Sequence, residues 1–481
     1  MSLSVFLFNG RPQLLGWERS RKAFLYTLLG MMLSICWNLN MNITKQEEGI
    51  GMTAGMAEPV TQTVQVNGSR LLQRLQALAQ IGANAQGGID RQLASAADIE
   101  ARAWLERCWA QELGLRVRTD AVLNLWGEGG AGLEPDLKPL VIGSHHDTVP
   151  NGGRFDGALG VLMATEALQS LQEQGVKLRH PVWLLSFAGE EPNGFSISTF
   201  GSKVLCGRLT SQDIERLKHR DTGEKLTAAI DRMGGDASAI DSAQLVPGSF
   251  AGFMECHIEQ GRRLIDAGET AAAVSCITGI YREVITVQGE ANHAGTTLYK
   301  DRRDALAAAS EVVLAVESLI RDPALAGVAA TVGHIEASPN ASNIVPGTVT
   351  MSLDLRTADP ALRKQALKQL GGAIDAIAAR RQVKITSTLN LDQAEMPLDA
   401  TVRTAIHDAC VATGQRDQLL VSMAGHDAAN MARLGPSGML FIASVDGYSH
   451  CPQEYSRDAD VVKGANIFVQ ALLNMDRRLD V

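Results

Sequence analysis

Five side chains of this sequence have the types that bind divalent cations: His145, Asp156, Glu191, His257 and His450. Neutral imidazole and carboxylate are the ligands that zinc or manganese prefers, and one carboxylate can bridge two ions through its two oxygens. Glycines on both sides of Asp156 allow a close approach of backbone and metal. Taken alone, His257 or His450 is more typical of an ordinary core or surface histidine. Together the five form a full ligand set for two ions, whose chemistry would be hydrolysis by an activated water molecule.

A free carboxylate, Glu190, precedes the candidate ligand Glu191 at the end of the apolar run 182–188. Adjacent side chains at a strand end point to different sides, so one carboxylate can bind metal while the other stays free. A free carboxylate beside an activated water is what a general base needs. A solvated surface turn is the competing interpretation of a Glu-Glu pair. The buried strand before the pair and Pro192 behind it favour a rigid, partly buried position.

A parallel sheet is the element that must bring these residues together. The runs 139–144 and 182–188 are unbroken and apolar, which is typical of strands covered on both faces, and 157–174 is predicted to be the helix between them. Chemistry in such sheets collects past the carboxyl ends of the strands, where His145 and Glu190 stand. The sequence therefore predicts an α/β fold with a mostly parallel sheet that carries a two-metal site.

A second unit, at 282–391, is predicted to interrupt this catalytic domain. Its pattern is βαββαβ, an α+β unit with two helices on one face of a small sheet: strand 283–288, helix 303–320, strands 327–335 and 347–355, helix 361–381 and strand 383–390. Elsewhere we expect helices at 71–81 and 96–113 and strands at 121–126 and 439–443. The expected organisation is an N-terminal extension (1–60), a first catalytic segment (61–281), the insertion (282–391) and a second catalytic segment (392–481).

The N-terminal extension holds an apolar run at 23–37 that follows basic residues. It is short for a bilayer span, which needs about 20 apolar residues. A signal anchor and a segment upstream of the true translation start are both open interpretations. We favour the second, because Met41, Met52 and Met56 offer later starts, and so expect no membrane association.

Composition narrows the function further. The chain has 481 residues, 45% of them hydrophobic and 20% charged, and a formal net charge of −9. It lacks a concentrated basic patch, which argues against a nucleic-acid partner and favours a small-molecule substrate. Its seven cysteines are scattered, with no CxxC pair, so we expect buried thiols in a reducing compartment, the cytoplasm.

Several motifs in order resemble the M20 metallopeptidase superfamily, and within it the ureido-hydrolase branch. That branch contains N-carbamoyl-L-amino-acid hydrolases, allantoate amidohydrolases and β-ureidopropionases. The resemblance runs from about Ser69 to the C-terminus. It rests on GSHHDTVPNGGRFDGALGV, the GEE strand end, HIEQG, GEANHAGTT with RRDA, SNIVPGTVTMSLDLR, AGHDA and GYSHCPQE. HIEQG and NHAGTT separate this branch from the general M20 peptidases.

The resemblance implies two divalent ions per subunit, Zn²⁺ or Mn²⁺, with Co²⁺ or Ni²⁺ also able to use the site. His145 and Glu191 would be terminal ligands of separate metals. Asp156 would bridge the ions, and His257 and His450 would complete the two shells. Zinc and manganese share these ligands, so the sequence leaves the native metal open.

The resemblance also implies catalytic and substrate-binding roles. Glu190 would be the general base, and Asp147 would hydrogen-bond a ligand histidine and set its tautomer. His293 of the insertion would stabilise the developing charge on the carbonyl oxygen, often across a dimer, so a homodimer through a lid domain is expected. The residues expected to bind a ureido carboxylate substrate are Gln260, Asn343 and Arg356.

The implied reaction is hydrolysis of an N-carbamoyl-L-amino acid to the amino acid, carbon dioxide and ammonia. Allantoate amidohydrolase is the close alternative, since allantoate also offers a ureido carbonyl beside a carboxylate. A β-ureidopropionase or an M20 peptidase is less favoured, and a binding protein that kept the fold would be expected to lack some ligands.

Some positions depart from the family pattern or have no clear role. Leu298-Tyr299 stands where family members usually have Pro-Met, and the loop 192–199 is unlike the common form. Both lie where the variable group of the substrate is expected, which leaves the side-chain preference open. His146 has no assigned role. We interpret His426 as a residue that supports the site. The alternative is that His426, and not His450, is a metal ligand.

Overall fold

The computed structural model describes residues 64–129, 132–134 and 136–479 of the chain. The apolar run at 23–37 and the whole expected extension 1–60 lie outside the described residues. Within the described ranges, no helix has both the length and the hydropathy needed to cross a bilayer.

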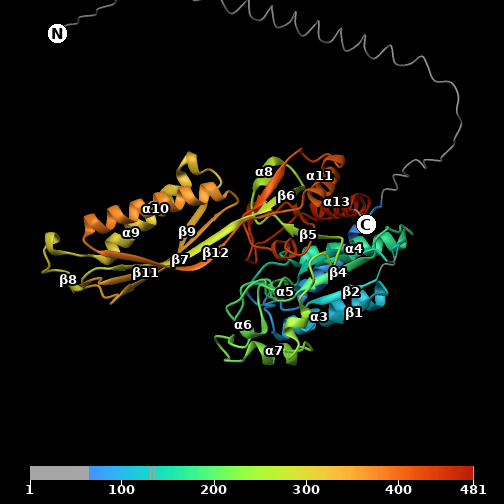
Figure 1. Ribbon diagram of the computed structural model, residues 1–481, viewed down its shortest axis with the longest axis horizontal. Coiled ribbons are helices and arrows are strands. Elements are labelled where there is room, and N and C mark those ends of the chain that lie inside the picture. Colours follow the sequence, from blue (N-terminus) through green and yellow to red (C-terminus); the bar gives the residue numbers. More distant parts are fainter. Residues whose placement is uncertain (1–63, 130–131, 135, 480–481) are drawn as a thin grey trace, which may run out of the picture. The chain divides into compact units, whose positions relative to one another are not determined.

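Over the described residues, a nine-stranded sheet forms the centre of the fold (Figure 1). Its strands are β1 (Arg116–Thr119), β2 (Leu125–Glu128), β3 (Leu140–His145), β4 (Val182–Phe187), β5 (Gly252–Ile258), β6 (Ala271–Ile277), β13 (Met396–Pro397), β14 (Leu419–Ser422) and β15 (Ser437–Ile442). They lie in the order β1-β2-β4-β3-β5-β15-β6-β13, with β14 paired to β6. The middle strands β4, β3, β5 and β15 are parallel to one another, and β1, β2 and β13 pair antiparallel at the edges. The predicted α/β class with a largely parallel centre is confirmed.

Helices cover both faces of this sheet. The first face packs against α2 (Gly68–Gln80), α3 (Ala96–Arg107), the π-helix Cys108–Glu112, α4 (Ala158–Glu173), α11 (Ala400–Ala412) and α13 (Asp458–Arg478). The second packs against α5 (Phe200–Leu205), α6 (Ser211–Ile214), α7 (Leu226–Arg232), η2 (Ile240–Ala243), α8 (Arg263–Ala267) and α12 (Ala428–Met431). On β3, Leu140 and Ile142 enter the first core and Val141 enters the second. Two buried faces explain why residues 140–142 of β3 and 182–185 of β4 are continuously apolar.

A separate four-stranded sheet forms within residues 279–393, in the order β12-β7-β11-β9 with every neighbour antiparallel. Its elements are β7 (Gly279–Gln288), α9 (Ala305–Arg321), β9 (Ala329–Ser338), β11 (Thr348–Thr357), α10 (Pro360–Arg381) and β12 (Lys384–Gln393). Alternate residues of β11, such as Val349, Met351 and Leu353, are buried in a core shared with α9 and α10. The remaining short elements are β8 (Asn292–His293), paired with β10 (Ile344–Val345), η3 (Tyr299–Asp301), η4 (Pro323–Leu325) and η5 (Val445–Gly447).

The stretch before β2 differs from its prediction. A strand was expected over 121–126, whereas β2 begins only at Leu125. The Asp120 carboxylate accepts hydrogen bonds from the backbone amides of Val122 and Asn124, at 3.0 and 2.9 Å. These bonds close a turn over residues that the apolar pattern assigned to a strand, because a short aspartate side chain can replace ladder hydrogen bonds locally.

Candidate metal centre

The candidate ligands stand at the carboxyl ends of the parallel strands. His145 is the last residue of β3, and His257 is the next to last of β5. Glu191 follows β4, Asp156 precedes α4, and His450 lies in the loop after β15. Because parallel strands end at the same edge of a sheet, residues far apart in sequence converge there.

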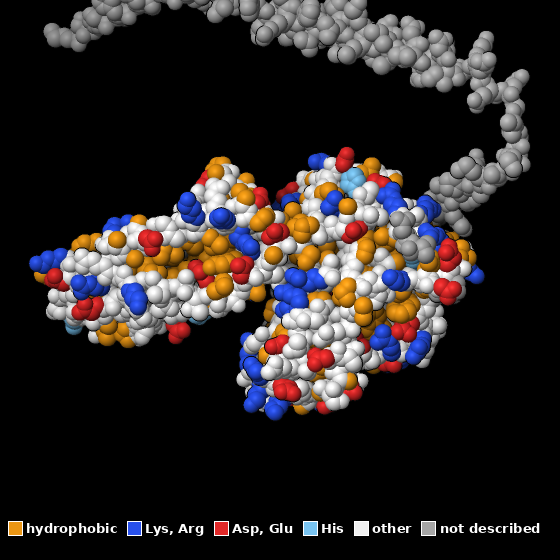
Figure 2. Space-filling model, in the orientation of Figure 1, with side chains coloured by type: hydrophobic (Ala, Val, Ile, Leu, Met, Phe, Trp, Pro, Cys, Tyr) orange, Lys and Arg blue, Asp and Glu red, His pale blue; other side chains and the backbone are white. Residues whose placement is uncertain are grey.

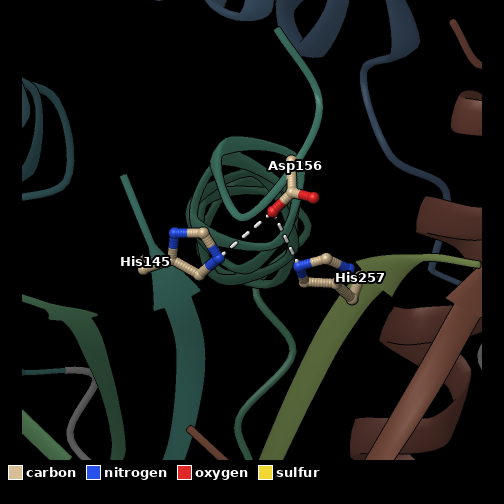
Figure 3. Close-up of side chains that lie close together, drawn as sticks. All are labelled: His145, Asp156 and His257. Atoms are coloured by element: carbon tan, nitrogen blue, oxygen red, sulfur yellow. Dashed lines mark ion pairs between the residues drawn. The ribbon is translucent and has the colours of Figure 1, made fainter. Parts of the chain in front are cut away.

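The first candidate ligand group is formed by His145, Asp156 and His257, all buried (Figure 3). Asp156 Oδ1 lies 3.3 Å from His145 Nε2 and 3.1 Å from His257 Nε2. The other ring nitrogens face backbone oxygens: His145 Nδ1 is 3.1 Å from the oxygen of Asp147, and His257 Nδ1 is 2.9 Å from that of Ile258. A proton on Nδ1 leaves the Nε2 lone pair free for a cation.

The second group is formed by Asp156, Glu191 and His450. His450 Nε2 lies 3.3 Å from Glu191 Oε1 and 3.5 Å from Asp156 Oδ2. One oxygen of Asp156 therefore faces the first group and the other faces the second. This is the arrangement in which a single carboxylate can bridge two cations.

Two observations show that these residues fit cations. Among the described residues, His145 Nε2 and Glu191 Oε1 are buried polar atoms without a hydrogen-bond partner, and such atoms are costly unless a ligand completes them. Burial raises the pKa of Glu191 well above its usual value, and the charge of Asp156 adds to this. A bound cation would be a partner for the unpaired atoms, and its positive charge would favour the ionised form of Glu191.

Gly157 shows how closely the backbone approaches this site. It has φ +62°, and a Cβ there would lie 2.3 Å from Cε1 of His145. Any other residue would be strained and would displace the imidazole.

Glu190 stands beside the first group. Its Oε2 lies 3.9 Å from His145 Nε2. Burial raises its pKa well above the usual value, although the neighbouring imidazole of His145 opposes the shift. Among the described residues, no side chain donates a hydrogen bond to its carboxylate. The group is thus free to take up a proton.

Asp147 contacts the backbone that carries this base. Its Oδ1 accepts a hydrogen bond from the amide of Glu190, and its Oδ2 accepts one from the amide of Glu191, each at 3.1 Å. The hydrogen bond expected between Asp147 and a ligand histidine is made instead through the backbone oxygen of Asp147, since its Oδ1 lies 3.7 Å from His145 Nδ1. The Asp147 carboxylate therefore orients the Glu190-Glu191 pair.

Sequence reasoning missed Glu454 and Ser449. Glu454 Oε1 accepts hydrogen bonds from the amides of Phe155 and Asp156, at 2.8 and 3.0 Å. Ser449 donates a hydrogen bond to Asp156 Oδ2 at 2.9 Å. Burial raises the pKa of Glu454 to about 7, with the charge of Asp156 the next cause. Both residues belong to the GYSHCPQE motif, which was the available signal.

Two other histidines near the ligands have side-chain partners of their own. His146 is buried between Asp98 Oδ1 at 2.8 Å and Ser186 Oγ at 2.7 Å. His426 Nε2 lies 2.7 Å from Ser422 Oγ, and its ring packs against that of His257 with 4.5 Å between centroids. His426 is in neither ligand group, so it supports the site by packing.

A cavity of about 190 Å³ opens on the candidate ligands, and two of the three predicted substrate-binding residues line it. Gln260 Nε2 donates a hydrogen bond to Asp156 Oδ2 at 2.7 Å. Arg356 pairs with Asp354 at 2.7 Å and donates a hydrogen bond to the backbone oxygen of Met423 at 2.9 Å.

Two further residues that were predicted to act at the site, Asn343 and His293, lie outside this cavity. Asn343 and His293 are exposed beside the β8–β10 pair, where the backbone oxygen of Asn343 accepts a hydrogen bond from Ala294. Neither residue is among those that line the cavity.

Paired groups of imidazole and carboxylate at the edge of a parallel sheet, with a free carboxylate beside them, define a hydrolase that works with divalent cations. The profile of peptidase family M20/M25/M40 matches residues 141–474, and the chain belongs to this family, whose enzymes typically use divalent metals.

Curated relatives cover most of the chain. It is 35% identical over 403 residues to an N-carbamoyl-L-amino acid amidohydrolase of Geobacillus stearothermophilus, a match that covers 84% of this chain and 97% of the relative. It is 34% identical over 394 residues to a ureidoglycolate hydrolase of Arabidopsis thaliana (80% and 82%). It is 33% identical over 399 residues to an allantoate amidohydrolase of Bacillus subtilis (83% and 95%).

A solved structure agrees in fold. An amidase of the hydantoinase/carbamoylase family from Burkholderia multivorans superposes with a TM-score of 0.79 at 32% identity, covering 86% of this chain and 98% of that one. The chain is thus an amidohydrolase of the ureido-hydrolase branch and acts on C–N bonds. The predicted family is confirmed.

Proposed function

We propose that this enzyme hydrolyses the ureido C–N bond of an N-carbamoyl-L-amino acid, giving the amino acid, carbon dioxide and ammonia. The position of Asp156 carries the proposal: its two oxygens face two ligand groups, with Glu190 free beside them. The relative from G. stearothermophilus supports this substrate class.

Two divalent cations would be held by the residues of the two groups, with Asp156 shared between them. The ligand types suit zinc or manganese, and cobalt or nickel can use the same set. Bound there, the cations would polarise the ureido carbonyl and acidify a water molecule.

Glu190 is the proton carrier of the proposed reaction. Its carboxylate takes the proton of the attacking water and delivers it to the leaving nitrogen. The raised pKa of Glu190 suits this task, because a base must hold the proton long enough to pass it on. Asp147 keeps the carrier in place through the two backbone amides.

Arg356, Asn343 and Gln260 are proposed to bind the substrate. A guanidinium can meet a carboxylate with two parallel hydrogen bonds, which makes Arg356 the natural partner of the α-carboxylate. Its ion pair with Asp354 restricts the side chain before substrate arrives. Gln260 lies against Asp156, so it can reach the ureido group.

His293 is proposed to stabilise the charge that develops on the carbonyl oxygen. Its Nδ1 accepts hydrogen bonds from the amides of Gly295 and Thr296, at 3.0 and 3.1 Å. The ring proton is therefore on Nε2, which becomes a donor. Because His293 does not line the cavity of its own chain, we assign this role to a second copy in a homodimer formed through a lid domain at 282–391.

Allantoate hydrolysis is the second candidate, favoured by the relative from B. subtilis. The test is a kinetic panel of N-carbamoyl-L-amino acids, allantoate, ureidoglycolate, N-carbamoyl-β-alanine and a dipeptide, with Mn²⁺ or Zn²⁺ added. Turnover of allantoate about a hundredfold more efficient than that of every carbamoyl amino acid would replace the first candidate by the second. Cleavage of the dipeptide alone would establish a peptidase.

The cytoplasm is the proposed location. The six cysteines among the described residues are all unpaired, as expected of a reducing compartment. Cell fractionation with antibody detection tests this, and recovery of the protein outside the cytoplasm would contradict it.

A further inference from the structure

Four basic side chains line the cavity, and only two of them form an ion pair among the described residues. Arg282 and Arg356 both pair with Asp354, each through a contact of 2.7 Å. Lys203 and Arg208 have no carboxylate oxygen within ion-pair distance among the described residues. Lys203, on α5, and Arg208, just after it, therefore have no direct ion pair with the described residues, although Glu190 and Asp427 act on Lys203 at longer range. Figure 2 shows basic side chains on the face over α5.

Arg208 is held in place by neutral groups. Its Nη1 donates a hydrogen bond to Asn430 Oδ1 at 3.0 Å. The amide of Asn430 donates in turn to Ser202 Oγ at 2.8 Å, and Ser202 donates to Asp427 Oδ1. This chain of bonds directs the carbonyl end of Asn430 at the guanidinium. It occupies one of the guanidinium nitrogens and leaves the other donors for a ligand.

Lys203 is held in a similar way. Its Nζ donates a hydrogen bond to the backbone oxygen of Ser198 at 2.7 Å, which leaves two of its three donors free. Burial lowers the pKa of Lys203, and the charge of Arg208 lowers it further. An anion between the two side chains would offset both effects, because it stabilises each charged form.

The positions of the Lys203 and Arg208 side chains indicate which part of the substrate they would contact. Under the proposed function, the ureido group meets the metal centre, and the α-carboxylate meets Arg356. Lys203 and Arg208 belong instead to the first catalytic segment, next to the loop 192–199, whose Ser198 and Thr199 also line the cavity. The part of the substrate left for them is its side chain.

We propose that Lys203 and Arg208 form an anion subsite that selects ureido substrates with a carboxylate in the side chain. The N-carbamoyl derivatives of L-glutamate and L-aspartate are of this class. The second arm of allantoate is a neutral ureido group, and apolar side chains offer no acceptor, so both would gain less from two cations. The inference rests on the proposed function, since it assigns the remaining parts of the same substrate.

A pair of substrates that differ only in charge provides the test. N-carbamoyl-L-glutamate and N-carbamoyl-L-glutamine have the same shape, and the acid should have a kcat/KM about tenfold higher or more. A ratio near one, or a preference for the amide, would overturn the subsite. Calorimetric binding of the products L-glutamate and L-glutamine makes the same comparison without turnover.

Substitutions locate the effect. Arg208→Gln and Lys203→Gln should each reduce the acid-to-amide ratio about tenfold, and Arg208→Glu should reverse the preference. Arg433→Gln is the matched control. It removes a positive charge close enough to lower the pKa of Arg208, but Arg433 does not line the cavity, so the ratio should change much less. Equal losses in all three Gln variants would mean a diffuse field and would overturn the subsite.

These experiments distinguish an error in the proposed function from an error in the anion subsite. If no ureido compound is turned over, the proposed function is wrong, and product binding still decides the subsite. If ureido compounds are turned over without regard to side-chain charge, the function stands and the subsite is wrong.

Discussion

Glu454 accepts a hydrogen bond from the backbone amide of Asp156 at 3.0 Å, across 298 residues of sequence. The same carboxylate oxygen also accepts the amide of Phe155. The two bonds fix the start of the segment that presents the shared carboxylate to both ligand groups. The segment 392–481 thus positions a candidate ligand supplied by the segment 61–281, and it also supplies the candidate ligand His450.

Replacing Glu454 by alanine should weaken cation binding about 10- to 100-fold, because the backbone amides of Phe155 and Asp156 both lose their acceptor. Glu454→Gln keeps one acceptor oxygen and should be intermediate. Metal titration with an indicator dye measures the affinity. Glu173→Gln, at an exposed carboxylate on α4, is the control and should bind like the wild type. Unchanged affinity in Glu454→Ala would contradict the positioning role.

Glu190→Gln should reduce kcat about 10²- to 10⁴-fold, because an amide cannot take up the proton of water. The side chain keeps its shape and belongs to neither ligand group, so metal content should stay normal. Steady-state kinetics and elemental analysis of the same sample test the two halves. Activity near that of the wild type would remove Glu190 from its role.

Arg356→Ala should mainly raise KM for carboxylate substrates, corresponding to about 2–5 kcal/mol if the pair with substrate is desolvated. Arg356→Lys should restore little, since an ammonium cannot form two parallel bonds. Arg321→Ala breaks an ion pair with Glu317 on α9, where neither residue lines the cavity, and serves as the control. An unchanged KM in Arg356→Ala would refute the assignment.

A mixing experiment tests whether His293 acts across a dimer. The Glu190→Gln and His293→Ala variants should each be nearly inactive alone. After unfolding and refolding together in equal amounts, roughly a quarter of the sites combine an intact Glu190 with the partner's intact histidine, so about that share of activity should return. No recovery, in a sample shown by sedimentation to be dimeric, would place His293 in its own chain or outside catalysis.

Cation binding should release protons at neutral pH. In the metal-free protein, burial disfavours the charged form of His145, but Asp156, Glu190 and Asp147 raise its pKa well above the usual value. Burial raises the pKa of Glu191 as well. Both groups must lose a proton to bind metal, so affinity should increase as pH rises through these raised values. Calorimetry in two buffers of different ionisation enthalpy measures the release. An affinity that falls as pH rises would contradict the prediction.

The sequence was informative wherever chemistry depends on residue type and on the end of a buried strand. The runs 139–144 and 182–188 predicted two strands of a parallel sheet, and the structure pairs them directly. The polar residues at their ends led us to expect His145, Glu190 and Glu191 at one edge. His257 and His450 depended on motif order, since a lone histidine has many ordinary roles. The expected strand at 121–126 was misplaced, because apolar periodicity does not register the turn that the Asp120 carboxylate closes.

Residue types, motif order and strand ends could be read from the sequence because each is a property of a short segment. Only the tertiary structure decided which groups are hydrogen-bond or ion-pair partners of each side chain. It directed the carboxylate of Asp147 at two backbone amides and His146 at Asp98. It also left Lys203 without a carboxylate within ion-pair distance among the described residues. The physical reason is that a hydrogen bond or ion pair needs two groups within a few ångströms, and for groups tens or hundreds of residues apart that distance is set by packing of the whole core.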